Sequence, residues 1–138
     1  MMRNKTVFDT NVWVSYFLRG KFAELVDLVF EDGVDFYRAK ELTEELRKVL
    51  NRDKFKKYLT LPVNEYISFY EDLSSLIEIK HLFSGCRDPK DNFLFDLAYQ
   101  SKARFLVSGD KDVRETPITQ PLNVVSLSIF KEMVSKRV

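Results

Sequence analysis

The chain contains very little cysteine and histidine, with one residue of each among 138. The lone Cys86 cannot form a disulfide within the chain, and together with His81 it cannot supply the four ligands of a structural zinc ion. Any metal held here must be bound by oxygen, and oxygen ligands favour Mg²⁺ or Mn²⁺. With no disulfide and no recognisable signal peptide, we expect a cytoplasmic protein.

The chain also lacks a strong net charge, long apolar runs and segments rich in Gly and Pro. Its net charge is +1, so nucleic acid would have to be bound by a local patch or through a metal ion. No apolar run approaches the roughly 18 residues that would span a membrane, so no membrane partner is expected. With only four Gly and four Pro, the sequence contains no segment that reads as a flexible linker. Hydrophobic residues make up 45% and charged residues 31%, which is ordinary for a globular protein. We therefore expect one domain over residues 1–138.

Short apolar runs alternate with segments of helical periodicity. Strands are predicted at residues 5–8, 34–37, 76–79, 105–107 and 123–125, and helices at 11–18, 21–31, 40–50, 62–74, 89–102 and 127–136. This alternation predicts an α/β fold with a mainly parallel sheet of about four to five strands, flanked by helices. In such sheets the functional residues gather at the carboxyl ends of the strands.

Two acids follow predicted strands. Asp9 comes directly after the first strand, and Asp110 lies three residues beyond the strand at 105–107. Both carboxylates are thus predicted at one edge of the sheet. The alternative interpretation makes Asp9 only a helix cap and Asp110 only part of a turn.

Two predicted helices carry further acids at the border of their apolar faces. On the helix at 40–50, a helical wheel places Glu45 at that border and Glu44 in solvent. An alternative for Glu45 is a solvated ion pair with Lys48. On the helix at 89–102, Asp91 lies at the border, and its alternative is the third position of a helix-start motif.

Two other acids of that helix have different interpretations. Asp88 precedes Pro89 and is interpreted as the N-cap of the helix. Asp96 is placed more fully outward.

Clustered carboxylates are unfavourable without a counterion. Two carboxylates about 6 Å apart repel by roughly 3 kcal/mol at an effective dielectric constant near 20. A divalent cation reverses the sign of this interaction, so a cluster of this kind indicates a metal site.

Read together, four segments resemble the PIN-domain family of metal-dependent nucleases. They are residues 7–11, 45–52, 88–98 and 103–112, and the resemblance extends roughly from Lys5 to Lys131. No single segment is specific, but the ordered set is. The last two segments are similar to the subgroup described as toxin components of toxin–antitoxin pairs.

The resemblance implies a single PIN-like domain that hydrolyses RNA phosphodiester bonds with one or two Mg²⁺ or Mn²⁺ ions. It implies products with 5′-phosphate and 3′-hydroxyl ends. The acids that it implies as metal ligands and catalytic residues are Asp9, Glu45, Asp91 and Asp110, and the residues expected close to them are Thr10, Asn11, Asp88, Ser108 and Asp112. As partners it implies an RNA substrate, a small antitoxin protein and a second copy of the chain.

Two surfaces are predicted to serve these partners. For RNA backbone contacts, the candidates crowded into eleven residues are Arg47, Lys48, Arg52, Lys54, Lys56 and Lys57, and a merely solvated charged face is the alternative. Phe55 and Tyr58, within this run, are interpreted as core residues rather than base-stacking platforms. For the homodimer, apolar residues on the first two helices that exceed what one core can bury are Trp13, Tyr16, Phe17, Phe22 and Val26.

Three other functions fit less well. A phosphotransfer enzyme with Asp9 as nucleophile would want a second Asp where Asn11 stands, or paired acids before the phosphorylated Asp. A non-catalytic RNA-binding or assembly domain could keep the same fold. A thiol enzyme built on Cys86 and His81 lacks an orienting third group. An RNA-processing nuclease outside a toxin pair remains an alternative within the nuclease reading.

Overall fold

The protein folds around a five-stranded parallel sheet, described by a computed structural model over residues 3–135. The strands are β1 (Asn4–Phe8), β2 (Val34–Arg38), β3 (Ser74–Leu76), β4 (Phe105–Val107) and β5 (Asn123–Val125). Their order is β3-β2-β1-β4-β5, and every pair is parallel. The single α/β domain predicted from the sequence is confirmed.

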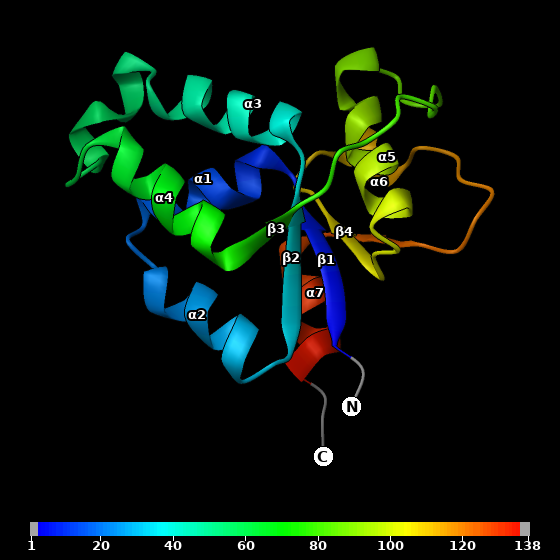
Figure 1. The fold of residues 1–138 in the computed structure, drawn as a ribbon, viewed down its shortest axis with the longest axis horizontal. Helices are drawn as coiled ribbons and strands as arrows, with labels where there is room; N and C mark the ends of the chain where they lie inside the picture. The colour runs from blue at the N-terminus through cyan, green and yellow to red at the C-terminus, as the bar shows by residue number, and fades with distance from the viewer. Residues whose placement is uncertain (1–2, 136–138) are drawn as a thin grey trace.

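Helices cover the sheet on both sides. They are α1 (Thr10–Leu18), α2 (Phe22–Phe30), α3 (Lys40–Leu50), α4 (Val63–Leu73), α5 (Asn92–Gln100), α6 (Lys111–Arg114) and α7 (Leu127–Ser135), with 3₁₀ turns η1 (Asp53–Tyr58) and η2 (Pro89–Asp91). In Figure 1, α1 to α4 lie to one side of the strands, α5 and α6 lie to the other, and α7 lies behind. The turn η1 and the short α6 were not predicted, and the predicted end of the last helix at Lys136 lies outside the described residues.

The central strands are apolar because both faces of the sheet are covered. Every residue of β4 is fully buried, as are Val7 and Phe8 of β1. The edge strand β3 is instead partly exposed, with Leu76 60% accessible. Continuous apolar runs for buried parallel strands and shorter, more polar edges are the expected pattern.

The strand β3 begins two residues earlier than predicted. The helix α4 ends at Leu73, and the Ser74 hydroxyl donates to the Tyr70 carbonyl at 2.5 Å. The guanidinium of Arg38 donates to the Glu71 and Ser74 carbonyls, which holds this helix end against β2. Strand pairing therefore starts as soon as the helix stops, a tertiary constraint that the local sequence does not contain.

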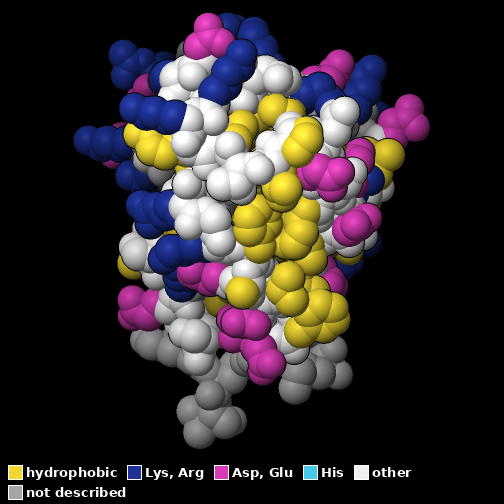
Figure 2. Space-filling view, turned by 90° about the vertical axis from the view of Figure 1, so that its left-hand side faces the viewer, with side chains coloured by type: hydrophobic (Ala, Val, Ile, Leu, Met, Phe, Trp, Pro, Cys, Tyr) yellow, Lys and Arg dark blue, Asp and Glu magenta, His cyan; other side chains and the backbone are white. Residues whose placement is uncertain are grey.

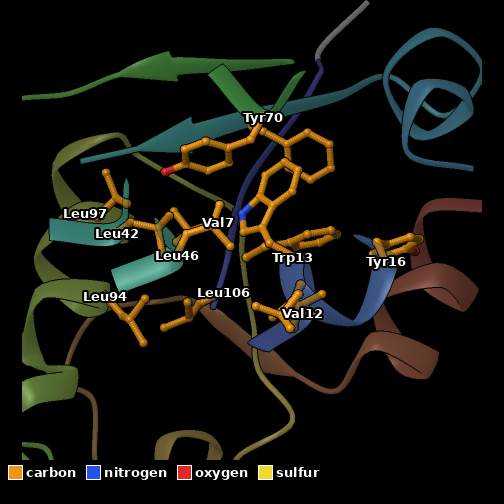
Figure 3. Close-up of a cluster of buried hydrophobic side chains, with 14 of the residues drawn as sticks. Val7, Val12, Trp13, Tyr16, Leu42, Leu46, Tyr70, Leu94, Leu97 and Leu106 are labelled. Atoms are coloured by element: carbon orange, nitrogen blue, oxygen red, sulfur yellow. The ribbon is translucent and has the colours of Figure 1, made fainter. Parts of the chain in front are cut away.

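The core is built around Trp13, which is fully buried. Its ring meets Tyr70 edge-on at 5.0 Å and lies 4.9 Å from the ring of Phe36. Figure 3 shows Trp13 among the labelled apolar side chains, with Tyr70 on one side and Val12 on the other. Aromatic pairs at these separations add to the stabilisation that apolar burial provides.

The predicted surplus of apolar side chains on the first two helices is wrong for three residues. Trp13, Tyr16 and Phe17 are buried within this one chain, at 0%, 3% and 1% exposure. Phe22 and Val26 are half-buried. The helix α1 is enclosed because it packs against α2 and α3 as well as against the sheet, so nearly its whole circumference is apolar.

Candidate active site

The carboxyl ends of β1 and β4 bring Asp9 and Asp110 to one edge of the sheet. The two strands pair in register, with Phe8 opposite Val107. The Asp9 amide continues this ladder by donating to the Val107 carbonyl at 2.9 Å. The sheet thus fixes the backbone of Asp9 beside the loop that leads to Asp110.

Ser108 links the two acids directly. Its hydroxyl donates to Asp9 Oδ2 at 2.7 Å and accepts from the Asp110 amide at 3.0 Å. Ser108 is fully buried and Asp9 is only 6% exposed. A short, buried hydrogen bond to a carboxylate restricts the orientation of that carboxylate, so Ser108 orients Asp9.

Thr10 makes the equivalent link to α3. Its hydroxyl donates to Glu45 Oε1, which joins the first residue of α1 to the middle of α3. Glu45 is half-buried and Glu44 is exposed, as the helical wheel predicts. Glu44 instead lines a groove of about 560 Å³ on the outer side of α3.

Asp88 and Asp91 have separate roles at the start of α5. The prediction that Asp88 is a cap is confirmed, because its Oδ1 accepts from the Lys90 amide at 3.0 Å. Asp91 precedes α5 but accepts no capping hydrogen bond from that helix. The Asp91 carboxylate therefore does not cap α5, a role that the sequence alone could not exclude.

The acids affect one another's pKa values. The pKa of Asp91 is raised to about 6, first by burial and then by the negative charges of Asp9, Asp88, Asp110 and Glu45. Burial also raises the pKa of Asp9, and the charges of Glu45 and Asp110 add to that effect, while the hydrogen bond from Ser108 opposes it. All the causes that act on Asp91 disfavour its ionised form.

The helix-cap alternative fails for Asp9, whereas Asp110, for which the alternative was part of a turn, does have a local structural role. The Asp9 side chain makes no capping hydrogen bond to α1. Asp110 Oδ1 accepts from the Asp112 amide at 2.9 Å and so caps the short α6. Asp110 therefore combines a local structural role with a place in the acid cluster.

Two of the neighbouring residues expected at the site face elsewhere. Asn11 is exposed. The carboxylate of Asp112 lies 3.6 Å from the Arg87 guanidinium, in an exposed ion pair. The thiol pair considered above does not form either, since His81 contacts Glu41 and the Cys86 thiol contacts Thr116.

Asp96 was placed outward on the predicted helix, and this is wrong. It is 3% exposed, and its Oδ1 accepts from the amides of Leu82 and Phe83 at 3.0 and 2.9 Å. The segment that precedes the helix folds over this face and supplies donors that a helical wheel cannot represent. The available signal was the spacing of polar residues along the helix, with Asn92, Asp96 and Gln100 four residues apart.

The predicted RNA-contact residues form an exposed basic run at the end of α3 and along η1. All six (Arg47, Lys48, Arg52, Lys54, Lys56 and Lys57) are exposed. Figure 2 shows Lys and Arg side chains gathered along one side of the face formed by α2 and α4. The core interpretation is wrong for Tyr58, which is 51% exposed beneath the Lys57 ammonium, whereas Phe55 is half-buried against the core.

The acid cluster suits a hard divalent cation by donor type and by charge. Carboxylate and hydroxyl oxygens are the ligands that Mg²⁺ and Mn²⁺ prefer. Burial and mutual repulsion raise the pKa values of Asp9 and Asp91, and a cation would offset both effects. As the side chains stand, however, no group of three or more His, Cys, Asp and Glu within residues 3–135 forms a ready coordination site.

Comparisons with known proteins agree with this geometry. A family model described as the PIN domain matches residues 5–112. An uncharacterized protein of Methanocaldococcus jannaschii is 31% identical over 113 residues, which cover 79% of this chain and 72% of that protein. No solved structure matches the chain at a significant level.

The part of the chain that the structure describes has no helix long and apolar enough to cross a membrane. The matched family supports a nuclease-type function in general. The matched residues include all four candidate acids, Asp9, Glu45, Asp91 and Asp110. The chain belongs to the PIN-domain family.

Proposed function

We propose that this protein is a divalent-metal-dependent endoribonuclease whose site consists of Asp9, Glu45, Asp91 and Asp110. The observation that carries the proposal is the position of Asp91, whose pKa is raised by burial and by the charges of four acids, three of which come from other parts of the fold. Maintaining such repulsion in a folded protein has a physical reason if a cation enters the cluster.

The four acids would have different roles in binding the metal and in catalysis. Asp9, Asp91 and Asp110 would hold one or two Mg²⁺ or Mn²⁺ ions, and Glu45 would serve as a further ligand or as the base. When bound, such an ion supplies charge that stabilises the attacked phosphate and lowers the pKa of the attacking water. Ser108 orients Asp9 and Thr10 orients Glu45, so both carboxylates are held by the hydroxyl groups of buried residues.

Basic side chains outside the cluster would hold the RNA backbone. Arg47 and Lys48 line the groove beside α3 together with Arg38 and Lys40, and the remaining exposed basic residues continue along η1. Phosphates are commonly bound by such groups, and the binding is weakened by salt.

The biological setting that we propose is a toxin of a toxin–antitoxin pair acting in the cytoplasm. The resemblance of residues 88–98 and 103–112 to that subgroup supports it, and a small antitoxin protein would be the partner. A small antitoxin gene beside this one would distinguish a toxin from an RNA-processing nuclease.

We further propose that the chain forms a homodimer. The support is an apolar band on the face formed by α2 and α4. Lys and Arg border this band on one side, and Asp and Glu border it on the other (Figure 2). Phe30, at the end of α2, is 74% exposed. A two-fold interface is the usual way to cover such a band.

The proposal is tested by incubating the purified protein with a generic single-stranded RNA in Mn²⁺ and in EDTA. We expect cleavage in Mn²⁺ only, with new 5′-phosphate and 3′-hydroxyl ends detected by end-specific labelling. Cleavage that persists in EDTA, or products with cyclic phosphate ends, would contradict the metal-dependent mechanism. RNA that is bound but stays intact in Mn²⁺ would favour the non-catalytic alternative.

The affinity for Mn²⁺ is expected to depend on pH because the ligands must be ionised. The pKa of Asp91, about 6, lies above its usual value, so this carboxyl is protonated in the metal-free protein at lower pH. Deprotonating it alone should raise the Mn²⁺ affinity about tenfold between pH 5 and pH 7. Isothermal titration calorimetry at several pH values measures this slope.

The same shift has the opposite effect on stability without metal. Because the folded state binds the Asp91 proton more tightly than the unfolded state does, metal-free stability falls as the pH rises from about 4 to about 6.

The control for the affinity measurement is Asp91→Asn, which should flatten the pH dependence of any remaining Mn²⁺ affinity. An Mn²⁺ affinity that is constant between about pH 5 and pH 7 in the wild type would show that Asp91 is not a ligand.

A further inference from the structure

Residues 80–86 have neither helical nor strand structure, and they lie against the helix α5. We call these residues the strap. In Figure 1 the green chain that leaves β3 runs upward between α3 and α5 before it reaches η2. A segment of this kind needs partners for its backbone groups wherever it is shielded from water.

Three polar side chains of α5 supply those partners at intervals of one helical turn. Asn92 Oδ1 accepts from the Cys86 amide at 3.0 Å. Asp96 Oδ1 accepts from two successive strap amides, and the Gln100 amide group bonds both the N–H and the C=O of Lys80 at 2.8 and 2.6 Å. Since residues four apart share one face of a helix, one stripe of α5 bonds the whole length of the strap.

Ring stacking on α5 and a side-chain contact to α3 complete the attachment. The Phe83 ring stacks on Phe95 of α5 with centroids 4.5 Å apart. On the other side, His81 Nε2 lies 2.5 Å from Glu41 Oε2, one turn before Glu45 in α3. The strap therefore joins the helix that carries Glu45 to the helix that follows Asp91.

We propose that the strap is a positioning device that holds the Asp91 turn against Glu45, with Asp96 as its central positioning residue. This inference rests on the proposed function. The strap leads directly into Asp88, which caps the turn that carries Asp91. The acids at this junction repel one another, so the turn must be held by contacts outside the cluster, and the hydrogen bonds to α5 supply them.

Asp96 is suited to this role by its burial. It is 97% removed from solvent, and two strap amides share its Oδ1. Removing a buried acceptor leaves both amides unsatisfied, which costs more than the hydrogen bonds themselves contributed. Asn keeps the accepting oxygen, so Asp96→Asn is the conservative replacement and Asp96→Ala the disruptive one.

The single cysteine provides a native probe of the strap. Cys86 is half-buried at its end, and burial, helped by nearby acids including Asp96, raises the pKa of its thiol. The rate at which a thiol reagent such as DTNB labels it is therefore compared at equal thiolate fraction, obtained from the pH dependence of the rate, and then reports how often the strap opens. The experiment measures this rate, together with Mn²⁺ affinity by calorimetry, in wild type, Asp96→Ala, Asp96→Asn and Gln100→Ala. Tyr99→Phe is the matched control, because it removes a hydrogen bond from α5 to the Gln120 carbonyl in a different loop.

In Asp96→Ala we expect labelling about tenfold faster and Mn²⁺ affinity about tenfold weaker, at temperatures well below the melting transition. Gln100→Ala should shift both quantities in the same directions by less, and it keeps the test valid if Asp96→Ala does not fold. Asp96→Asn and Tyr99→Phe should stay within about twofold of wild type. By reciprocity, Mn²⁺ should slow the labelling of Cys86 in the wild type.

Several results would overturn the inference. Faster labelling with unchanged Mn²⁺ affinity would show that the strap serves stability alone, and unchanged labelling in both Asp96→Ala and Gln100→Ala would show that α5 does not hold it. If Mn²⁺ affinity follows the strap but RNA is never cut, the proposed function fails and the inference stands. A wild type that binds no Mn²⁺ overturns both.

Discussion

Glu45→Gln is expected to reduce RNA cleavage by about 10² or more, whereas Glu44→Gln should leave it within about twofold of wild type. Glu45 is half-buried, is held by the Thr10 hydroxyl and lies close enough to affect the pKa of Asp9 and Asp91. Glu44 is exposed on the outer side of α3. The measurement is the initial rate of cleavage in saturating Mn²⁺.

The pair of variants is well matched, because both remove one charge from adjacent positions of one helix. Equal melting temperatures would establish that any difference in rate arises at the site. A larger loss of rate in Glu44→Gln would mean that the acid facing the substrate lies on the other side of α3. The Thr10–Glu45 contact would then be structural only.

Asp9→Asn is expected to abolish the response of stability to Mn²⁺ without weakening the metal-free protein. Burial and two neighbouring acids raise the pKa of Asp9, so neutralising it relieves repulsion, and Asn can still accept from Ser108. An ion at a hundredfold excess over its dissociation constant stabilises by about 2.7 kcal/mol. For a domain of this size that corresponds to a rise of roughly 8 °C in the melting temperature of the wild type.

Thermal melting in EDTA and in Mn²⁺ tests this, together with cleavage of the generic RNA. The control is Ser126→Ala, which removes an acceptor for the Ile129 amide at the start of α7 without changing an acid. Losing a cap typically costs about 1 kcal/mol regardless of metal. If Asp9→Asn behaves like this control in both buffers and still cuts RNA, the proposed role of Asp9 is wrong.

The periodicity of the sequence was sufficient to predict the alternation of strands and helices, and with it the edge of the sheet where Asp9 and Asp110 lie. It could not predict the strand order, in which β1 pairs with β2 and β4. Nor could it place β3, because the start of that strand is set by Arg38 from β2 bonding the end of α4.

Within the candidate site, the wheel argument correctly separated Glu45 from Glu44 because an apolar face dominates α3. The same argument failed for Asp96, whose surroundings come from the strap and not from its own helix. The partners of Thr10 and Ser108 are also beyond local reasoning, since Glu45 lies 35 residues from Thr10 in the chain. Residue types predict the chemistry, but long-range contacts determine which acids are oriented.

The hydrogen bond between Ser108 and Asp9 spans 99 residues of sequence. During synthesis, β1 leaves the ribosome long before β4, the strand that completes its other side, because about 100 residues separate the two in the sequence. Closing such a long loop is entropically costly and slow compared with forming a helix. A growing chain therefore carries Asp9 without the contact that orients it until Ser108 has left the ribosome, so any activity of this site must await synthesis of that segment.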